Sequence, residues 1–145
     1  MPQPPLKIKG VDHIVLRARD VKRMIAFYCD VLGCALDHEQ PALGLYHLRA
    51  GSALIDLVAL DGPLGAKGGA APGVEGRNVD HFALAVESFD EAVLRAHFEA
   101  HGATVTQGGD RYGAEGEGPS IYVLDPEGNE VEIKGPAYPD AAAKG

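Results

Sequence analysis

A short internal repeat constrains this chain more than any other feature of its sequence. Residues 10–16 read GVDHIVL and residues 78–84 read NVDHFAL, so the triplet Val-Asp-His recurs 68 residues further along the chain. Each segment is rich in residues that favour strands, and a helix pattern follows it directly. We therefore expect the chain to contain the same structural unit twice.

The two helix patterns begin and end at residues that suit helix ends. The first is expected to start at Asp20, a good N-cap, and to end at Gly33. The second is expected to start at Ser88, which forms a capping-box pattern with Glu91, and to end at Gly102. The apolar residues of the first helix recur at helical spacing and form one stripe: Met24, Phe27, Tyr28, Val31 and Leu32.

Three strand-like stretches follow each helix, so each unit is expected to be a βαβββ module with mainly antiparallel pairing after the helix. The expected strands are 35–40, 43–50 and 53–60, and then 103–108, 119–124 and 129–134. Between the units, residues 61–77 contain six glycines and two prolines without periodicity, which predicts a linker loop, and 113–118 is a second glycine-rich stretch expected as a loop. The expected boundaries are module 1 at 7–60, the linker at 61–77, module 2 at 78–135 and a tail at 136–145, with both chain ends frayed.

The composition is typical of a folded soluble protein and argues against two classes of partner. The broad apolar set makes up 46% of the residues, yet no apolar run approaches the ~18 residues of a membrane span, and the N-terminus does not resemble a signal peptide. The net charge is −8, and residues 61–145 carry 15 acidic against 6 basic side chains. Such a field repels nucleic acids and acidic membranes. Two cysteines are too few for a disulfide scaffold, so a cytoplasmic protein is expected.

The repeat also places a histidine and a carboxylate at matching positions of the two units. His13 and His81 lie on the first strand of each unit, and Asp56 and Glu132 lie on the last. If the units pair about a pseudo-twofold axis, these four side chains can converge in one groove. Imidazole with carboxylate oxygen suits Zn, Ni, Co, Mn or Fe(II), and two histidines with one carboxylate form the triad of non-haem iron enzymes. Taken singly, each residue could instead be structural or solvated.

Of these four residues, Asp56 is the one whose two nearest neighbours on each side in the sequence are all apolar. It interrupts the apolar run 53–60, where a carboxylate costs several kcal/mol unless it is paired, protonated or bound to a metal.

Three longer motifs carry a family resemblance: VDHIVL at 11–16, FYCDVLG at 27–33 and YVLDPEGNEVEI at 122–133. Together they resemble the vicinal oxygen chelate superfamily, which includes glyoxalase I, extradiol dioxygenases, methylmalonyl-CoA epimerase and the fosfomycin- and bleomycin-resistance proteins. The resemblance covers about residues 9–135. It implies an α+β fold in which two βαβββ modules form a mixed, partly closed sheet around a metal-binding groove.

The resemblance also assigns roles to individual residues. It implies one divalent metal per chain, bound by His13, His81 and Glu132, with Asp56 as a candidate fourth ligand. Glyoxalase-type members usually carry a Glu where Asp56 stands, and Asp is one methylene shorter. A neighbouring carboxylate, Glu132 or Asp56, is expected to move a proton between substrate carbons. Tyr122 resembles a tyrosine found in extradiol dioxygenases and fosfomycin-resistance enzymes and is a third candidate catalytic residue.

Arg17 lies four residues after His13, so strand periodicity places both on one face. It resembles the arginine that bacterial glyoxalase I directs at the glutathione carboxylate, and is therefore a candidate substrate residue. The asparagine that would accompany it is replaced by Leu60, and a rim ion pair is the alternative for Arg17.

The expected function is that of a metal-dependent glyoxalase-family enzyme acting on a small hydroxycarbonyl or thiol adduct through a metal-chelated enediolate or enolate. The alternatives are an Fe(II)-dependent extradiol-type dioxygenase and a fosfomycin- or bleomycin-resistance-type protein. Ring cleavage needs an acid–base histidine upstream of the second ligand, and none lies between His47 and His81. The expected partners are a small-molecule substrate and a second copy of the chain in a homodimer, with no nucleic acid and no membrane.

Overall fold

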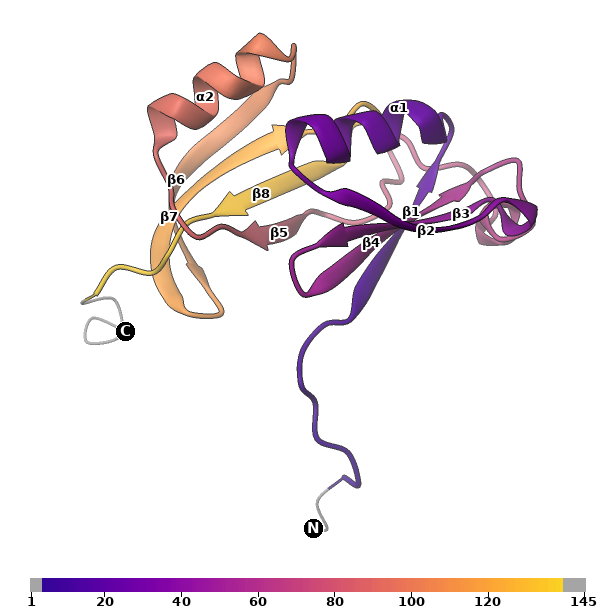
Figure 1. Ribbon diagram of the computed structural model, residues 1–145, viewed down its shortest axis with the longest axis horizontal. Coiled ribbons are helices and arrows are strands. Elements are labelled where there is room, and N and C mark those ends of the chain that lie inside the picture. Colours follow the sequence, from indigo (N-terminus) through magenta and orange to yellow (C-terminus); the bar gives the residue numbers. More distant parts are fainter. Residues whose placement is uncertain (1–3, 140–145) are drawn as a thin grey trace.

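The computed structural model describes residues 4–139 and contains two four-stranded sheets of the same topology (Figure 1). Module 1 contains β1 (His13–Ala18), β2 (Ala35–Gln40), β3 (Leu45–Ala50) and β4 (Ala53–Ala59). Module 2 contains β5 (Phe82–Ala85), β6 (Val105–Gly113), β7 (Gly116–Leu124) and β8 (Glu130–Lys134). The strand orders are β1-β4-β3-β2 and β5-β8-β7-β6, and in each sheet only the first pair is parallel. The expected α+β class and the repeated βαβββ order are confirmed. Of the ends expected to fray, residues 1–3 and 140–145 lie outside the described part.

The helices differ from expectation in two details. The first is the short helix α1 (Val21–Ala26), capped by Asp20 and continued by a π-helical turn, η1 (Phe27–Val31), before Gly33 at φ +82°. The second, α2 (Glu91–Ala100), is capped by Asp90, whose carboxylate accepts from the backbone N–H of Val93 at 3.2 Å. The predicted start at Ser88 is therefore wrong. Aspartate is a strong N-cap, and its negative charge is favoured at the positive end of the helix.

The glycine-rich stretch 113–118 was expected as a loop, and this is wrong. β6 and β7 form a long antiparallel ribbon in which Asp110 pairs with Pro119 and Tyr112 with Glu117, and only a tight turn separates Gly113 from Gly116. Ladder hydrogen bonds use backbone groups alone, so glycines can take part in them. In the linker 61–77, the only regular element is the 3-10 turn η3 (Gly65–Gly68).

Each sheet has one face covered by its helical segment and one open face. Both helices lie on the same side of the two sheets (Figure 1). Along β1, Leu16 and Ala18 are fully buried against the helical layer, whereas His13 and Val15 lie on the opposite face and are exposed. The open faces of the two sheets therefore carry the predicted site residues. Within one chain the two sheets stay open and separate rather than forming one partly closed sheet.

A buried polar junction fixes the two modules relative to each other. The hydroxyl of Tyr28 in module 1 donates to Asp125 Oδ2 in module 2 at 2.8 Å, and both groups are buried. The two carboxylate oxygens of Glu127 accept from the backbone N–H groups of Arg19 and Asp20, each at 2.8 Å. One apolar core is continuous across both modules. None of the helices within residues 4–139 is long and apolar enough to cross a membrane.

Candidate metal centre

In module 2, His81 and Glu132 form a close pair on the open sheet face. His81 stands at the entrance to β5, and Glu132 lies on the neighbouring strand β8 opposite Ala83. The Nε2 atom of His81 lies 3.2 Å from Glu132 Oε1, and its Nδ1 atom lies 2.6 Å from Asp80 Oδ2. The aspartate of the repeated triplet therefore holds Nδ1, which leaves Nε2 directed at the carboxylate.

Two hydroxyl groups on β7 fix the carboxylate of Glu132. Ser120 donates to Oε2 at 2.6 Å, and Tyr122 donates to Oε1 at 2.9 Å. Both residues lie on the face of β7 that Glu132 shares, because Tyr122 is paired with Glu132 across the ladder. Burial and the hydrogen bond to Glu132 raise the pKa of Tyr122, with Arg111 opposing the shift, so its phenol keeps the proton that it donates.

Module 1 repeats the arrangement with a longer gap. His13 Nδ1 lies 2.7 Å from Asp12 Oδ1, as His81 Nδ1 does from Asp80, but His13 Nε2 lies 3.9 Å from Asp56 Oδ2. Asp56 is 4% exposed, so the carboxylate predicted from the apolar run 53–60 is indeed buried. Its second oxygen, Oδ1, is taken by a residue that the sequence did not single out as functional.

That residue is His47, on β3. Its Nδ1 lies 2.8 Å from Asp56 Oδ1, and its Nε2 lies 2.9 Å from the side-chain nitrogen of Gln40 on β2. The ring also stacks on His38, with centroids 5.6 Å apart. His47 pairs directly with Asp56 across the β3–β4 ladder. The only sequence signals for His47 were its position beside the apolar Leu48 and its nine-residue spacing to Asp56, and both are weak.

The two candidate histidines share an electrostatic setting. The hydrogen bond with Asp12 and then the charge of Asp56 raise the pKa of His13 above 6.5. The hydrogen bond with Asp80 and then the charge of Glu132 raise the pKa of His81 in the same direction. Each imidazole is therefore a more basic nitrogen donor than a free histidine.

The single chain does not unite the two pairs. Within residues 4–139, no three His, Cys, Asp or Glu side chains are arranged so that they could hold one metal ion. The structure brings His81 to Glu132 and His13 to Asp56, but it leaves the pairs apart. Because the buried junction fixes the modules, the two pairs of one chain stay apart, and each pair by itself supplies only two ligands.

Arg17 lies on the open face of β1, as the sequence predicted, but its guanidinium is bound to the linker. It donates to four backbone carbonyl oxygens, those of Gly65, Gly68, Gly69 and Ala70, at 2.8–3.3 Å. A Cβ atom at position 68 would lie 2.5 Å from the guanidinium carbon, so a larger residue there would push the Arg17 side chain away from the linker. A substrate carboxylate would have to displace these bonds in order to reach Arg17.

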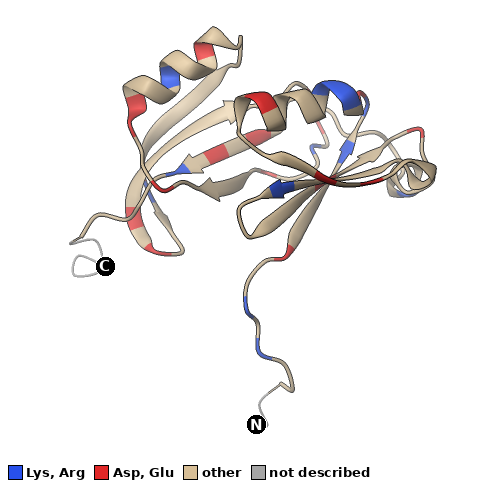
Figure 2. Cartoon of the chain, viewed as in Figure 1, with Lys and Arg blue, Asp and Glu red and all other residues tan. Residues whose placement is uncertain are grey.

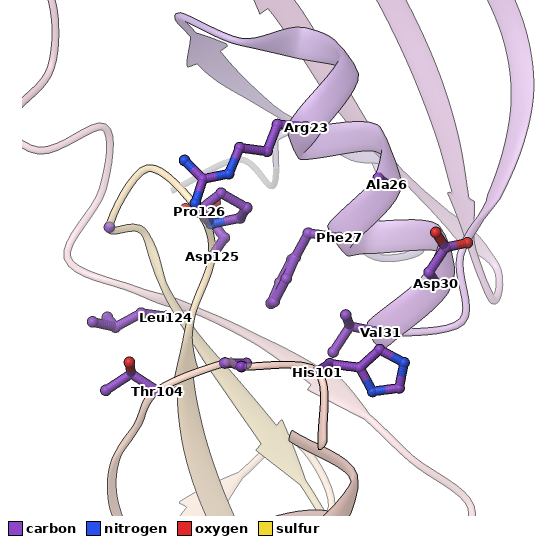
Figure 3. Close-up of a pocket in the computed structure, with 13 residues that line it drawn as sticks. Arg23, Ala26, Phe27, Asp30, Val31, His101, Thr104, Leu124, Asp125 and Pro126 are labelled. Atoms are coloured by element: carbon purple, nitrogen blue, oxygen red, sulfur yellow. The ribbon is translucent and has the colours of Figure 1, made fainter. Parts of the chain in front are cut away.

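A separate hollow lies on the helical side of the molecule. It has a volume of about 520 Å³ and is lined by Arg23 and Phe27 of the first helical segment, by His101 after α2, and by the 124–128 turn (Figure 3). None of the predicted metal or catalytic residues lines it. The His81–Glu132 pair and the His13–Asp56 pair, which we call the two candidate half-sites, thus lie on the open sheet faces and not in this hollow.

The fold and the half-sites define a class of protein built from paired βαβββ modules with a histidine–carboxylate pair in each. The family described as the Glyoxalase/Bleomycin resistance protein/Dioxygenase superfamily matches residues 10–133, and the chain belongs to this family, the vicinal oxygen chelate superfamily. The glyoxalase-like fold expected from the sequence is therefore confirmed. Members of the superfamily are often metal-dependent enzymes, and many are dimers that bind small molecules.

Several solved structures are similar to this chain over nearly its whole length. The integron cassette protein VCH_CASS1 from Vibrio cholerae is 28% identical, with 90% of this chain and 97% of that one covered and a TM-score of 0.68. A virulence protein from Salmonella typhimurium is 25% identical, with coverages of 91% and 100% and a TM-score of 0.69. The fosfomycin resistance protein FosX from Listeria monocytogenes shares the fold at 19% identity, with coverages of 95% and 98% and a TM-score of 0.69.

Proposed function

We propose that this chain is a divalent-metal-dependent enzyme of the glyoxalase type. It would carry out lyase or isomerase chemistry on a small hydroxycarbonyl or thiol adduct. The observation that carries the proposal is the repeated Asp–His–carboxylate unit. In both modules an aspartate occupies Nδ1 of the histidine and leaves Nε2 facing a carboxylate.

The donor chemistry fits a metal ion. Histidines that ligate metals generally donate their other ring N–H to a carboxylate or carbonyl, which fixes the tautomer and makes the free nitrogen a better donor. Asp12 and Asp80 are placed to do this for His13 and His81. Nitrogen and carboxylate ligands suit Zn, Ni, Co, Mn or Fe(II). One FosX structure that shares this fold, at 17% identity, is described as complexed with Mn(II) and sulfate.

The complete centre is proposed to form between two copies of the chain. His81 and Glu132 of one protomer would meet His13 of its partner, with Asp56 of that partner beside them. The support is that the buried junction holds the modules of one chain apart while both half-sites lie on open faces. Val15, on the same face of β1 as His13, is 48% exposed, so apolar surface is available for the contact.

A divalent cation bound there would supply Lewis-acid polarisation of adjacent substrate oxygens. The chain's own residues would do the rest. His13, His81 and Glu132 would hold the cation, and Ser120 and Tyr122 would keep the Glu132 carboxylate in place. Asp56 would accept a proton from one substrate carbon and return it to the next, because its Oδ2 accepts no hydrogen bond from the described residues.

A pair of complementary variants tests both the ligands and their origin. We expect His13→Ala and His81→Ala to bind metal poorly as separate proteins. Co-expressed with different affinity tags and purified through both tags, they should yield a heterodimer that regains about one tight site, because one of its two sites keeps every ligand. A heterodimer that gains no site would mean that both histidines come from one chain, and strong binding by either homodimer would overturn the ligand set.

A fosfomycin-resistance activity is the second candidate function. The sequence EGEGPSIY at 115–122 resembles a stretch in fosfomycin-hydrolysing proteins, and FosX shares the fold. Loss of fosfomycin catalysed by the manganese-loaded protein, with no turnover of a hemithioacetal, would favour this function over the glyoxalase type.

A further inference from the structure

The carboxylates of the two modules are held in different ways, and this difference has a functional consequence. Glu132 is fixed by two hydroxyl groups and lies 3.2 Å from its histidine. Asp56 is fixed by an imidazole and lies 3.9 Å from its histidine. The shorter side chain of Asp56 and its bond to His47 draw the carboxylate towards β3 and away from His13.

The tautomer of neutral His47 follows from its two hydrogen-bond partners, Gln40 and Asp56. The Gln40 side-chain nitrogen can only donate, so His47 Nε2, at 2.9 Å, is the acceptor of this bond. The ring proton of neutral His47 is then on Nδ1, from which it donates to Asp56 Oδ1 at 2.8 Å. Gln40, His47 and Asp56 thus form one directed chain of hydrogen bonds in which the carboxylate is the final acceptor.

A β-bulge makes this chain of bonds possible. Leu36 pairs with Leu48, but the register then shifts, so that His38 pairs with His47 and Gln40 with Leu45. The extra residue turns His38 and Gln40 onto the open face, where Asp37 and Glu39 would otherwise lie. Without the bulge, a second carboxylate would lie on the face that carries buried Asp56. With it, the side-chain amide of Gln40 lies there and orients His47.

We propose that His47 is the positioning residue for Asp56, holding it beside the metal centre as a proton-transferring base instead of a metal ligand. This inference rests on the proposed function. With Oδ1 taken by His47, only Oδ2 faces His13 and the substrate. A proton leaves the substrate for Oδ2 and returns from Oδ2 to the substrate, while His47 keeps its own proton on Nδ1. The reaction is balanced without any further reactant.

The first test is metal affinity, measured by competition with a chelator, and it needs no substrate. We expect Glu132→Gln to weaken binding by at least ~100-fold, whereas Asp56→Asn and His47→Leu stay within about threefold of the unmodified protein. A loss in Asp56→Asn as large as that in Glu132→Gln would make Asp56 a ligand and overturn the inference. Unchanged affinity in Glu132→Gln would instead refute the proposed metal centre.

The second test is nitrogen-15 NMR of the histidine rings in the metal-free protein near neutral pH. We expect His47 to be the Nδ1–H tautomer, with a downfield Nδ1 proton that disappears in His47→Leu and shifts in Asp56→Asn. His38→Leu is the matched control, since it removes the stacked neighbour but leaves the hydrogen bonds. A proton on Nε2 of His47 would contradict the inference.

The third test is turnover of a hemithioacetal by the metal-loaded protein. We expect Asp56→Asn to fold and bind metal but to lose at least ~100-fold in kcat, the usual scale for a lost general base. His47→Leu should lower kcat with little change in KM. His47→Asn should recover part of the loss, because the Asn side-chain nitrogen can take the place of Nδ1. If His47→Asn is no better than His47→Leu, His47 does not act through its Nδ1 hydrogen bond.

Discussion

The two modules of this protein begin from the same triplet but finish their sites differently. Both fix a histidine through the preceding aspartate and place a carboxylate on the parallel neighbour strand, opposite the residue two positions after the histidine. In module 2 the carboxylate is a glutamate held by the hydroxyls of Ser120 and Tyr122. In module 1 it is an aspartate held by the ring of His47.

This difference shows how a repeated fold can hold equivalent carboxylates in different ways, which is the basis for the unequal roles proposed for them. Hydroxyl groups orient a carboxylate that still offers lone pairs to a metal. An imidazole N–H and a shorter side chain withdraw one oxygen and leave the other free. The charges differ as well: module 1 (7–60) carries seven basic and six acidic residues, whereas module 2 (78–135) carries three basic and twelve acidic ones. Figure 2 shows where these charges lie along the chain.

The largest effect is expected from the residues that the two modules share. His13→Ala and His81→Ala should each weaken metal binding by at least ~100-fold, because only water replaces the lost ligand. Isothermal titration with Zn or Mn measures this. His101→Ala, at the end of α2, is the control and should bind normally. Normal metal binding by His13→Ala would show that module 1 contributes no ligand. The repeated Val-Asp-His triplet would then have a metal-binding role in module 2 only.

A smaller effect is expected where only module 2 uses hydroxyl support. Tyr122→Phe removes one hydrogen bond to Glu132, and metal affinity should fall about 10-fold, as is usual when a residue that orients a ligand is lost. Tyr112→Phe, at an exposed position of β6, is the control and should leave affinity unchanged. If Tyr122→Phe binds metal normally, Ser120 alone is sufficient to orient Glu132.

The junction between the modules should contribute stability without affecting the half-sites. Tyr28→Phe removes a buried hydrogen bond to Asp125, which keeps its bonds from Asn129 and from two backbone N–H groups. We expect the free energy of unfolding to fall by about 1–2 kcal/mol in urea titrations. A change no larger than that in Tyr112→Phe would mean that the apolar core alone holds the modules together.

The smallest effect concerns pH. His13 and His81 have pKa values raised above 6.5, so the folded metal-free protein favours their protonated forms. The stability that the two protonated histidines contribute to the folded protein is complete below the pKa of an unfolded histidine. It is lost as pH rises through their raised pKa values in the folded state. A metal ion binds the neutral rings, so the stabilisation of the folded protein by metal should increase over the same range of pH. Thermal unfolding with and without metal between about pH 6 and 8.5 measures both trends, and parallel curves would contradict this linkage.

The sequence determined a large part of this structure by itself. The recurring Val-Asp-His and the helix-ending glycines 69 residues apart predicted two βαβββ modules, and the family match and the fold confirm this. The sequence also singled out Asp56, because a carboxylate in an apolar run is conspicuous without any structure. These features are local or periodic, so they can be read along a single strand or helix.

Only the tertiary structure decided which side chains meet. The bond from His47 to Asp56 depends on the β3–β4 register, and the bond from Gln40 depends on a bulge that turns β2 by one residue. Arg17 binds the linker because distant glycines let the chain approach it closely. The separation of the two half-sites is set by the buried contact of Tyr28 with Asp125, 97 residues away. The sequence pattern along a strand predicts on which face a side chain lies. Strand register and the packing of the modules determine which other side chains it contacts there.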